Sequence, residues 1–172
     1  MLYVRVRLAM LADAPSVAIV HVGSWRSTYR GLVPEEYLDG LSVDRRRKAW
    51  EQLIAEASED RGVLVLEDND TVVGFCHFSP TRDDDAGPAA GEVTAIDLLA
   101  SHWRRGGGSL LLVQAVQALT NAGFHRATLW VLDSNDRARR FYENHGWHPD
   151  GSIKVDDRGT FQLCELRYAR LL

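Results

Sequence analysis

The chain has 172 residues, 45% of them hydrophobic and 26% charged, and carries a formal net charge of −4. This length predicts a single domain over residues 1–172 that can bury a sizeable core. The negative charge gives no general attraction to nucleic acid, and since no run of about 18 apolar residues occurs, no transmembrane helix is expected.

The first residues alternate between apolar and polar side chains, which predicts a strand from Tyr3 to Leu8. They lack the apolar core and the small-residue cleavage site of a signal peptide. Only two cysteines occur, Cys76 and Cys164, and both stand inside apolar runs. We therefore expect buried, inert thiols in a protein of the reducing cytoplasm.

Hydrophobic periodicity and turn residues predict the remaining elements. In chain order they are a helix over 13–29, a helix over 44–57, strands over 63–66 and 71–78, a loop over 79–91, a strand over 92–100, a helix over 110–121, a strand over 126–132, a short helix from 134, and strands over 151–155 and 160–168. Asp13 is expected to cap the first helix. This order predicts one mixed α/β sheet with helices on both faces.

The stretch from residue 92 to residue 112 contains the strongest functional signal. An apolar strand ends near Ala100, and two arginines and three glycines (104–108) separate it from the next helix. Glycines allow the backbone to approach a ligand closely, and the unpaired N–H groups of a first helical turn attract anions. We interpret the stretch as a pyrophosphate-binding turn, with a flexible turn that binds nothing as the alternative.

Two nucleotide-binding motifs do not fit this turn. No Lys-Ser or Lys-Thr follows the glycines, so the P-loop pattern fails. The third glycine of a Rossmann fingerprint would stand at position 111, which is Leu111. Both mismatches argue against a nucleotide-binding regulatory domain, which stays as a hypothesis from a different functional class.

A second segment, residues 135–147, reads Asn-Asp-Arg-Ala-Arg-Arg-Phe-Tyr-Glu-Asn-His-Gly-Trp. With the glycines at 106–108, it resembles the GNAT N-acetyltransferase superfamily. That superfamily has a coenzyme A motif, Arg/Gln-x-x-Gly-x-Gly/Ala, and a late segment, Asn-x-x-Ala-x-x-Phe-Tyr-x-x-x-Gly-Phe. Residues 25–38, which begin Trp-Arg-x-x-Tyr-Arg-Gly-Leu, also look like one bacterial subgroup.

The resemblance implies a mixed, mainly antiparallel central sheet flanked by helices on both faces, and acetyl-CoA as the cofactor without a metal. In such enzymes, backbone amides after the central strand bind the pyrophosphate of coenzyme A. Here that role would belong to Arg104, Arg105, Gly106, Gly107, Gly108 and Ser109. The strand before them is splayed from its neighbour in these enzymes. Its backbone, here Leu98, Leu99 and Ala100, would bind the pantetheine arm and orient the acetyl carbonyl.

The same resemblance makes Tyr142 the candidate general acid that protonates the departing thiolate. Asn135 would hold the cofactor arm or only cap a helix. Glu92 stands where histone-type members carry a catalytic glutamate, and it is the first candidate base for the amine, directly or through water. Asp97 stands where an aromatic or apolar residue is common and is the second candidate base. A positioned acid or base contributes roughly 10²–10⁴-fold to the rate.

Several further residues allow both a structural and a functional interpretation. Trp25, Tyr29 and Tyr37 are either core aromatics or part of an acceptor pocket. His145 and His148 have a spacing found in metal sites. The helix ends between these histidines and no third ligand is evident, so a metal site is not expected.

The central motif departs from the family pattern at two positions. Trp103 stands where arginine or glutamine is usual, three residues before Gly106. Phosphate charge would therefore rest on Arg104, Arg105 and the backbone amides. Gly107 replaces a residue that is usually apolar, and an added glycine costs a helix up to about 1 kcal/mol.

We expect an acetyl-CoA-dependent N-acetyltransferase that acetylates a primary amine of a small molecule or a protein, by direct attack in a ternary complex. The alternative is a non-catalytic acyl-CoA-binding or sensing module on the same fold. The sequence does not define the acceptor. The aspartates at 83–85 are interpreted as a solvated loop, with steering of a cationic amine as the alternative. No nucleic-acid or membrane partner is expected, and homodimer formation is left open.

Overall fold

The structure is a computed structural model that describes residues 4–172. Its strands are β1 (Val4–Leu8), β2 (Gly62–Asp68), β3 (Thr71–Pro80), β4 (Ala90–Leu98), β5 (Arg126–Leu132), β6 (His148–Asp157) and β7 (Gln162–Leu171). The α-helices are α1 (Ala14–Thr28), α2 (Glu35–Asp39), α3 (Val43–Ala55), α4 (Gly107–Asn121) and α5 (Asp136–Glu143). Short 3₁₀ turns are η1 (Leu11–Asp13), η2 (Asp84–Ala86) and η3 (Ala100–His102). Tyr3, the expected start of the first strand, lies outside the described residues.

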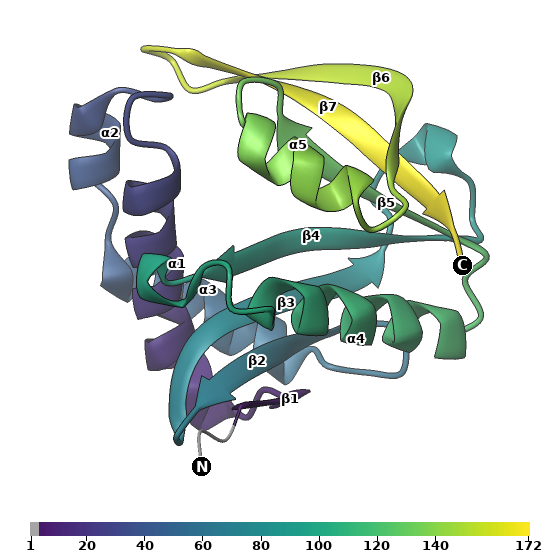
Figure 1. The fold of residues 1–172 in the computed structure, drawn as a ribbon, viewed down its shortest axis with the longest axis horizontal. Helices are drawn as coiled ribbons and strands as arrows, with labels where there is room; N and C mark the ends of the chain where they lie inside the picture. Colours follow the sequence, from purple (N-terminus) through teal and green to yellow (C-terminus); the bar gives the residue numbers. More distant parts are fainter. Residues whose placement is uncertain (1–3) are drawn as a thin grey trace.

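The strands form one sheet in the order β1-β2-β3-β4-β5-β7-β6. All neighbours are antiparallel except β4 and β5, which are parallel. Helices α1 and α3 pack on one face of the sheet, and α4 and α5 pack on the other (Figure 1). The predicted mixed, mainly antiparallel sheet with helices on both faces is therefore confirmed. In residues 4–172, no helix is long and apolar enough to cross a membrane.

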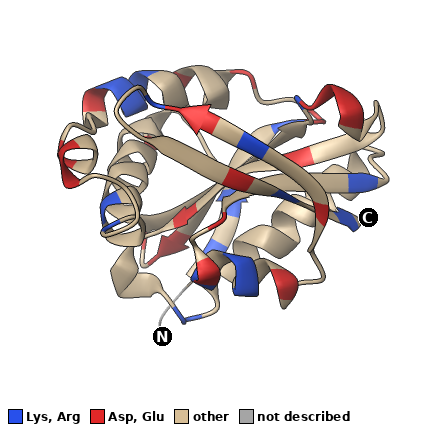
Figure 2. Ribbon diagram, turned by 90° about the horizontal axis from the view of Figure 1, so that it is seen from above, with Lys and Arg blue, Asp and Glu red and all other residues tan. Residues whose placement is uncertain are grey.

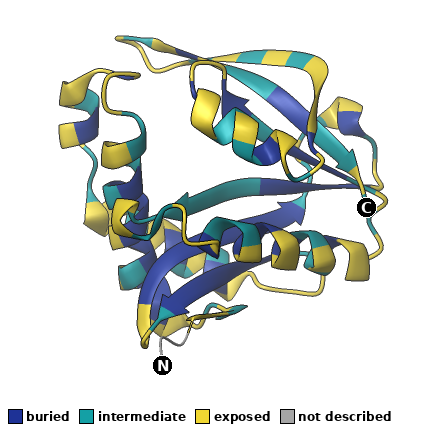
Figure 3. Ribbon diagram, viewed as in Figure 1, coloured by how far each residue is buried: buried dark blue, intermediate teal, exposed yellow. Residues whose placement is uncertain are grey.

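The central strands are buried on both faces, as Figure 3 shows for β2 and β3. Successive side chains of a strand point to opposite faces. In β2, Leu64 and Leu66 join the cluster under α4, and Val63 and Val65 join the cluster under α1 and α3. This double burial explains why the β2 sequence is a continuous apolar run rather than an alternating one.

Strands β4 and β5 separate soon after they meet. Their pairing is limited to Ala90–Glu92 opposite Arg126–Thr128. Beyond that point β5 continues to pair with β7 over its whole length, while β4 stays with β3. The β5-β7-β6 part of the sheet turns away from β4 (Figure 1). Among residues 4–172 no strand pairs with 93–98 on this side, so that edge of β4 is open to a ligand.

Four details differ from the sequence-based expectations. Helix α2 was not predicted, because five residues are too few for hydrophobic periodicity to show. Helix α4 begins at Gly107 rather than at residue 110. Asp13 occupies the N-cap position of α1, but its carboxylate binds Arg7 at 2.7 and 3.0 Å instead of capping the helix. Cys76 is buried as expected, whereas Cys164 is exposed. Cys164 lies opposite Val155 of edge strand β6, and both side chains are on the solvent face of the β6–β7 pair.

The loop between β3 and β4 is fixed to the far part of the sheet. Arg167 of β7, which is 4% exposed, donates to both carboxylate oxygens of Asp85 at 2.6 and 2.9 Å and contacts Asp83 at 3.4 Å. It also donates to Asp150 at 2.8 Å. Asp85 stays in solvent as expected, with a side chain that is 68% exposed, whereas Asp83 is only 21% exposed and both carboxylates bond Arg167. Elsewhere, basic and acidic segments are interleaved along the chain (Figure 2).

Candidate active site

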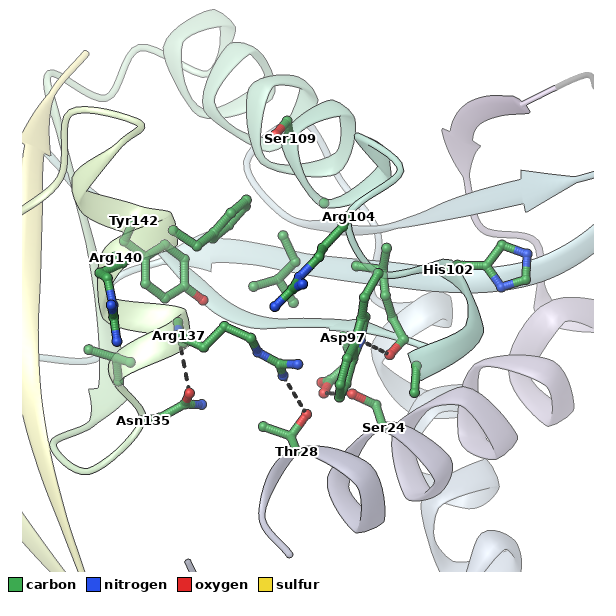
Figure 4. A pocket seen from close by; sticks show the side chains of 18 of the residues that line it. Ser24, Thr28, Asp97, His102, Arg104, Ser109, Asn135, Arg137, Arg140 and Tyr142 are labelled. Carbon is green, nitrogen blue, oxygen red and sulfur yellow. Dashed lines mark hydrogen bonds between the residues drawn. The ribbon is translucent and has the colours of Figure 1, made fainter.

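A cavity of about 720 Å³ lies where β4 leaves β5. Its walls come from α1, β4, η3, the turn before α4, the start of α4, β5 and α5, and Figure 4 shows most of the side chains that line it. Its lining includes ten of the candidate site residues named from the sequence: Tyr29, Asp97, Leu98, Ala100, Arg104, Gly106, Gly108, Ser109, Asn135 and Tyr142. The lining does not include Trp25, Tyr37, Glu92, Leu99, Arg105 or Gly107.

The N-terminus of α4 forms the anion-binding end of this cavity. Gly106 has φ +84° and precedes the helix, and the first N–H to bond within it is that of Leu110, which donates to the Gly106 carbonyl at 3.1 Å. The amides at 107–109 therefore have no partner inside the helix and face its open end. Arg104, with φ +60°, adds a positive charge beside them. Together these groups fit a pyrophosphate.

Gly107 and Gly108 serve different purposes. A Cβ atom on Gly107 would lie 2.5 Å from Cδ2 of buried Leu66, so only glycine lets α4 begin this close to the sheet. A Cβ atom on Gly108 would lie 3.4 Å from the Phe141 ring, an ordinary contact. The departure from the family pattern at position 107 thus follows from the packing of α4 against β2.

Trp103 binds the backbone at the end of β4 and the side chain of Arg137. Its indole Nε1 donates to the Leu98 carbonyl at 3.0 Å. The Arg137 guanidinium lies over its ring at 3.5 Å from the centroid and donates to Thr28 Oγ1 at 3.3 Å. One lone pair of the Leu98 carbonyl is therefore used within the protein, and the other stays free for a ligand. The Leu99 amide is also used, since it donates to the Val73 carbonyl at 2.9 Å.

Tyr142 extends from α5 into the cavity (Figure 4). Its side chain is 7% exposed, and its ring packs against Phe141 and Trp147 with centroids 5.3 and 6.4 Å away. In the described part of the chain no hydrogen bond involves its hydroxyl. Burial raises the pKa of Tyr142 well above its ordinary value, so the phenol stays protonated at neutral pH and can donate a proton.

Asp97 is the carboxylate that faces the cavity. It lies on β4, and its Oδ1 accepts a 2.8 Å hydrogen bond from Ser24 of α1. Burial raises the pKa of Asp97 from 3.8 to about 6, against the smaller opposing effects of the Ser24 hydrogen bond and the positive charge of Arg46. A carboxylate with a pKa in this range can accept a proton from an amine near neutral pH.

Glu92 lies further back on β4, where this strand is still paired with both neighbours. Its side chain is 2% exposed and accepts from the backbone amide of Arg82 at 3.2 Å and from the guanidinium at 3.1 Å. Glu92 therefore holds the start of the β3–β4 loop. Its part in proton transfer stays a prediction.

Asn135 and the N-terminal aromatic residues have clear positions. Asn135 caps α5, because its side-chain oxygen accepts from the Ala138 amide at 3.1 Å, and it also lines the cavity. Tyr29 lines the cavity and packs against Trp25 with ring centroids 4.6 Å apart. Tyr37 instead packs against Phe161 at 4.9 Å. The sequence could not distinguish these positions, because all three aromatic residues stand near helix ends.

Some lining residues had no sequence signal of their own. Ser24, Thr28 and Trp130 carry no motif, and only the fold brings them to the cavity. Arg137 and Arg140 stand inside the late segment, but at positions where its pattern accepts any residue. Within residues 4–172, no group of three or more His, Cys, Asp or Glu side chains could hold a metal ion.

The family model described as Acetyltransferase (GNAT) family matches residues 25–147. The chain belongs to this family. The matched range contains the Gly106–Gly108 turn, the open edge of β4 and Tyr142, so the family match and the cavity describe the same part of the molecule.

Similar proteins agree with this assignment. The uncharacterized N-acetyltransferase YuaI of Bacillus subtilis is 36% identical over 133 residues, which is 77% of this chain and 73% of YuaI. The PaiA N-acetyltransferase of Thermoplasma acidophilum, solved in complex with coenzyme A, has a TM-score of 0.77 at 18% identity, covering 99% of both chains. The putative acetyltransferase YncA of Salmonella typhimurium, solved with acetyl-CoA, has a TM-score of 0.71 at 20% identity, covering 98% and 94% of the two chains. YuaI is named as an N-acetyltransferase, and this chain has the fold of the solved GNAT structures.

Proposed function

We propose that this GNAT protein transfers an acetyl group from acetyl-CoA to a primary amine, by direct attack in a ternary complex. One observation carries the proposal. Gly108 and Ser109 in the first turn of α4, Tyr142 and Asp97 all line a single cavity beside the open edge of β4. An anion-binding end, a proton donor and a proton acceptor are the groups that thioester aminolysis requires.

The cofactor would lie along the open edge of β4. Its pyrophosphate would accept hydrogen bonds from the amides at 107–109, with Arg104 nearby, and its pantetheine arm would pass the backbone at 98–100. Bound acetyl-CoA supplies the activated acetyl thioester. The solved complexes of PaiA and YncA, which contain coenzyme A and acetyl-CoA, support this ligand class.

Proton transfer would be divided between two side chains. An ammonium is not a nucleophile, so a base must first remove a proton from the acceptor. We assign this role to Asp97, because it faces the cavity and is oriented by Ser24 without a cation bonded to it. Tyr142 would protonate the leaving thiolate, since burial keeps the phenol protonated and its hydroxyl is available.

Glu92 is the alternative base, acting through water. It is less suited to this role than Asp97, because the Arg82 guanidinium bonds its carboxylate and the cavity lining does not include it. Single substitutions of Glu92 and Asp97 distinguish the two roles.

The acceptor would enter from the α1 side, past Tyr29 and Asp97. Both a small molecule and the amine of a protein remain in this proposal. Two unpaired cysteines, Cys76 and Cys164, are in keeping with a reducing cytoplasm as the site of the reaction.

Thermal unfolding with acetyl-CoA, ATP and NAD tests the ligand class. At 100 times the dissociation constant, a ligand stabilises the folded state by roughly 2.7 kcal/mol. We expect the largest shift with acetyl-CoA, followed by release of free thiol when a suitable amine is added. A larger shift with ATP or NAD would reject the proposal in favour of a nucleotide-binding domain. Tight acetyl-CoA binding without thiol release over a broad amine panel would favour a sensing module.

A further inference from the structure

A histidine holds the serine of the anion-binding turn. His145 Nδ1 lies 2.7 Å from the Phe141 carbonyl oxygen, and its Nε2 lies 2.9 Å from Ser109 Oγ. A carbonyl oxygen can only accept, so Nδ1 carries the proton. In the neutral imidazole, Nε2 then has no proton and must accept the hydrogen bond from Ser109.

This arrangement fixes the hydrogen-bonding direction of Ser109. A serine hydroxyl has one proton, and here that proton is directed at His145 rather than at the cavity that Ser109 lines. The oxygen therefore presents lone pairs to the anion-binding end. Phosphate oxygens also present lone pairs, so the neutral pair does not suit a bound pyrophosphate.

Protonation of His145 reverses this direction. With a proton from solvent on Nε2, the imidazolium donates to Ser109 Oγ, and the serine proton becomes free to point at a phosphate oxygen. We propose that coenzyme A binding at the α4 N-terminus is coupled to proton uptake by His145, a positioning residue that turns Ser109 into a hydrogen-bond donor. This inference rests on the proposed function, because it takes coenzyme A as the ligand.

The charged groups around Ser109 and His145 come from several elements. Arg104 and Arg140 line the same cavity, and Arg170 of β7 donates to the His145 carbonyl at 2.8 Å. On α4, Ser109 is the group bonded to the imidazole. On α5, the carboxylate of Glu143 accepts from Tyr168 at 2.8 Å. A bound pyrophosphate would add negative charge at this end of the cavity, and that charge would attract an imidazolium at His145.

Calorimetry measures the coupling directly. Coenzyme A is titrated at pH 7 in buffers of different ionisation enthalpy, which reports the protons taken up on binding. We expect net uptake by the wild-type protein and none attributable to the protein in His145→Gln, whose amide does not titrate. Ser109→Ala should lower the uptake toward that of His145→Gln. Equal uptake by wild type and His145→Gln would overturn the inference, and unchanged uptake in Ser109→Ala would overturn the role of the serine hydroxyl.

The pH dependence of the affinity gives a second readout. If binding takes up a proton, the Kd of the wild type for coenzyme A should rise with pH, by up to about tenfold per pH unit, relative to that of His145→Gln. Titration of the cofactor's own phosphate cancels in this ratio. NMR of the His145 imidazole in the wild type, with and without coenzyme A, needs no variant and should show protonation on binding. Absence of any coenzyme A binding would reject the proposed function, whereas binding without protonation of His145 would reject only this inference.

Discussion

Ser24 of α1 donates a 2.8 Å hydrogen bond to Oδ1 of Asp97 on β4, and this contact joins the acceptor side of the cavity to the strand that would hold the cofactor. The hydroxyl orients the carboxylate without neutralising it. Burial then raises the pKa of Asp97 to about 6, which suits a base that works near neutral pH. The base assignment depends on this pair.

Asp97→Asn should remove the base. The amide keeps the shape of the side chain but cannot accept a proton, so we expect kcat to fall by roughly 10²-fold or more. In the wild type, kcat/KM should fall as the pH drops through about 6, because the Asp97 carboxylate becomes protonated. A pH profile of both proteins checks this, and an unchanged acid limb in Asp97→Asn would show that a different group titrates.

Asp97→Asn should also make the protein more stable at neutral pH. Since folding raises the pKa of Asp97 from 3.8 to about 6, the folded state binds more protons than the unfolded state between these values, and stability falls as the pH rises through them. Asp97→Asn should therefore be more stable than the wild type above pH 6, by roughly 3 kcal/mol at most, and nearly equal to it below pH 4. Urea unfolding at pH 4 and pH 8 measures this difference.

Tyr142→Phe should separate chemistry from binding. It removes only the hydroxyl, which makes no hydrogen bond in the described part of the chain, so the fold and the coenzyme A affinity should be retained. Loss of the proton donor should lower kcat by about 10²-fold. Steady-state kinetics and calorimetry check the two halves of this expectation. Equal turnover of the two proteins would reject Tyr142 as the acid.

The sequence predicted the sheet well, because its strands carry a strong periodic signal. Strand β2 is buried on both faces, and this requires the apolar run at 63–66 from which the strand was predicted. Asn69 and Asp70, both at positive φ, form the turn from which the hairpin between β2 and β3 was predicted. The glycine turn and the late segment then indicated the family. The start of α4 was missed because Gly107 is a poor helix former, and its presence is explained only by contact with Leu66.

The polar contacts of the site could not be predicted in the same way. Trp103 bonds the Leu98 carbonyl, and Arg137 reaches across to Thr28, only because the fold brings η3, α5 and α1 together. Neither contact has a fixed spacing in the sequence. For Glu92, the sequence suggested more than the structure supports. Its position resembles that of a catalytic glutamate, but its carboxylate bonds Arg82 at the start of the β3–β4 loop.

Glu92→Gln tests the alternative base. If Glu92 mainly holds the loop, the amide oxygen can still accept from the Arg82 amide, and kcat should change by less than about tenfold. Loss of the charged partner of Arg82 should cost about 1 kcal/mol of stability, because that guanidinium is largely exposed and regains water. A fall in kcat of about 10²-fold in Glu92→Gln, with little change in Asp97→Asn, would transfer the role of base to Glu92.

Two neighbouring glycines provide a matched test of the α4 start. In Gly107→Ala the new Cβ atom would lie 2.5 Å from Leu66 Cδ2, so α4 or the buried leucine must shift, and we expect a loss of roughly 1–3 kcal/mol. In Gly108→Ala the new atom would meet Phe141 at 3.4 Å, and the higher helix propensity of alanine should leave stability unchanged or raise it by up to about 1 kcal/mol. Chemical denaturation of both variants measures the contrast. Equal stabilities would mean that α4 is free to move from the sheet, and the anion-binding turn would then not be held rigidly by its packing against β2.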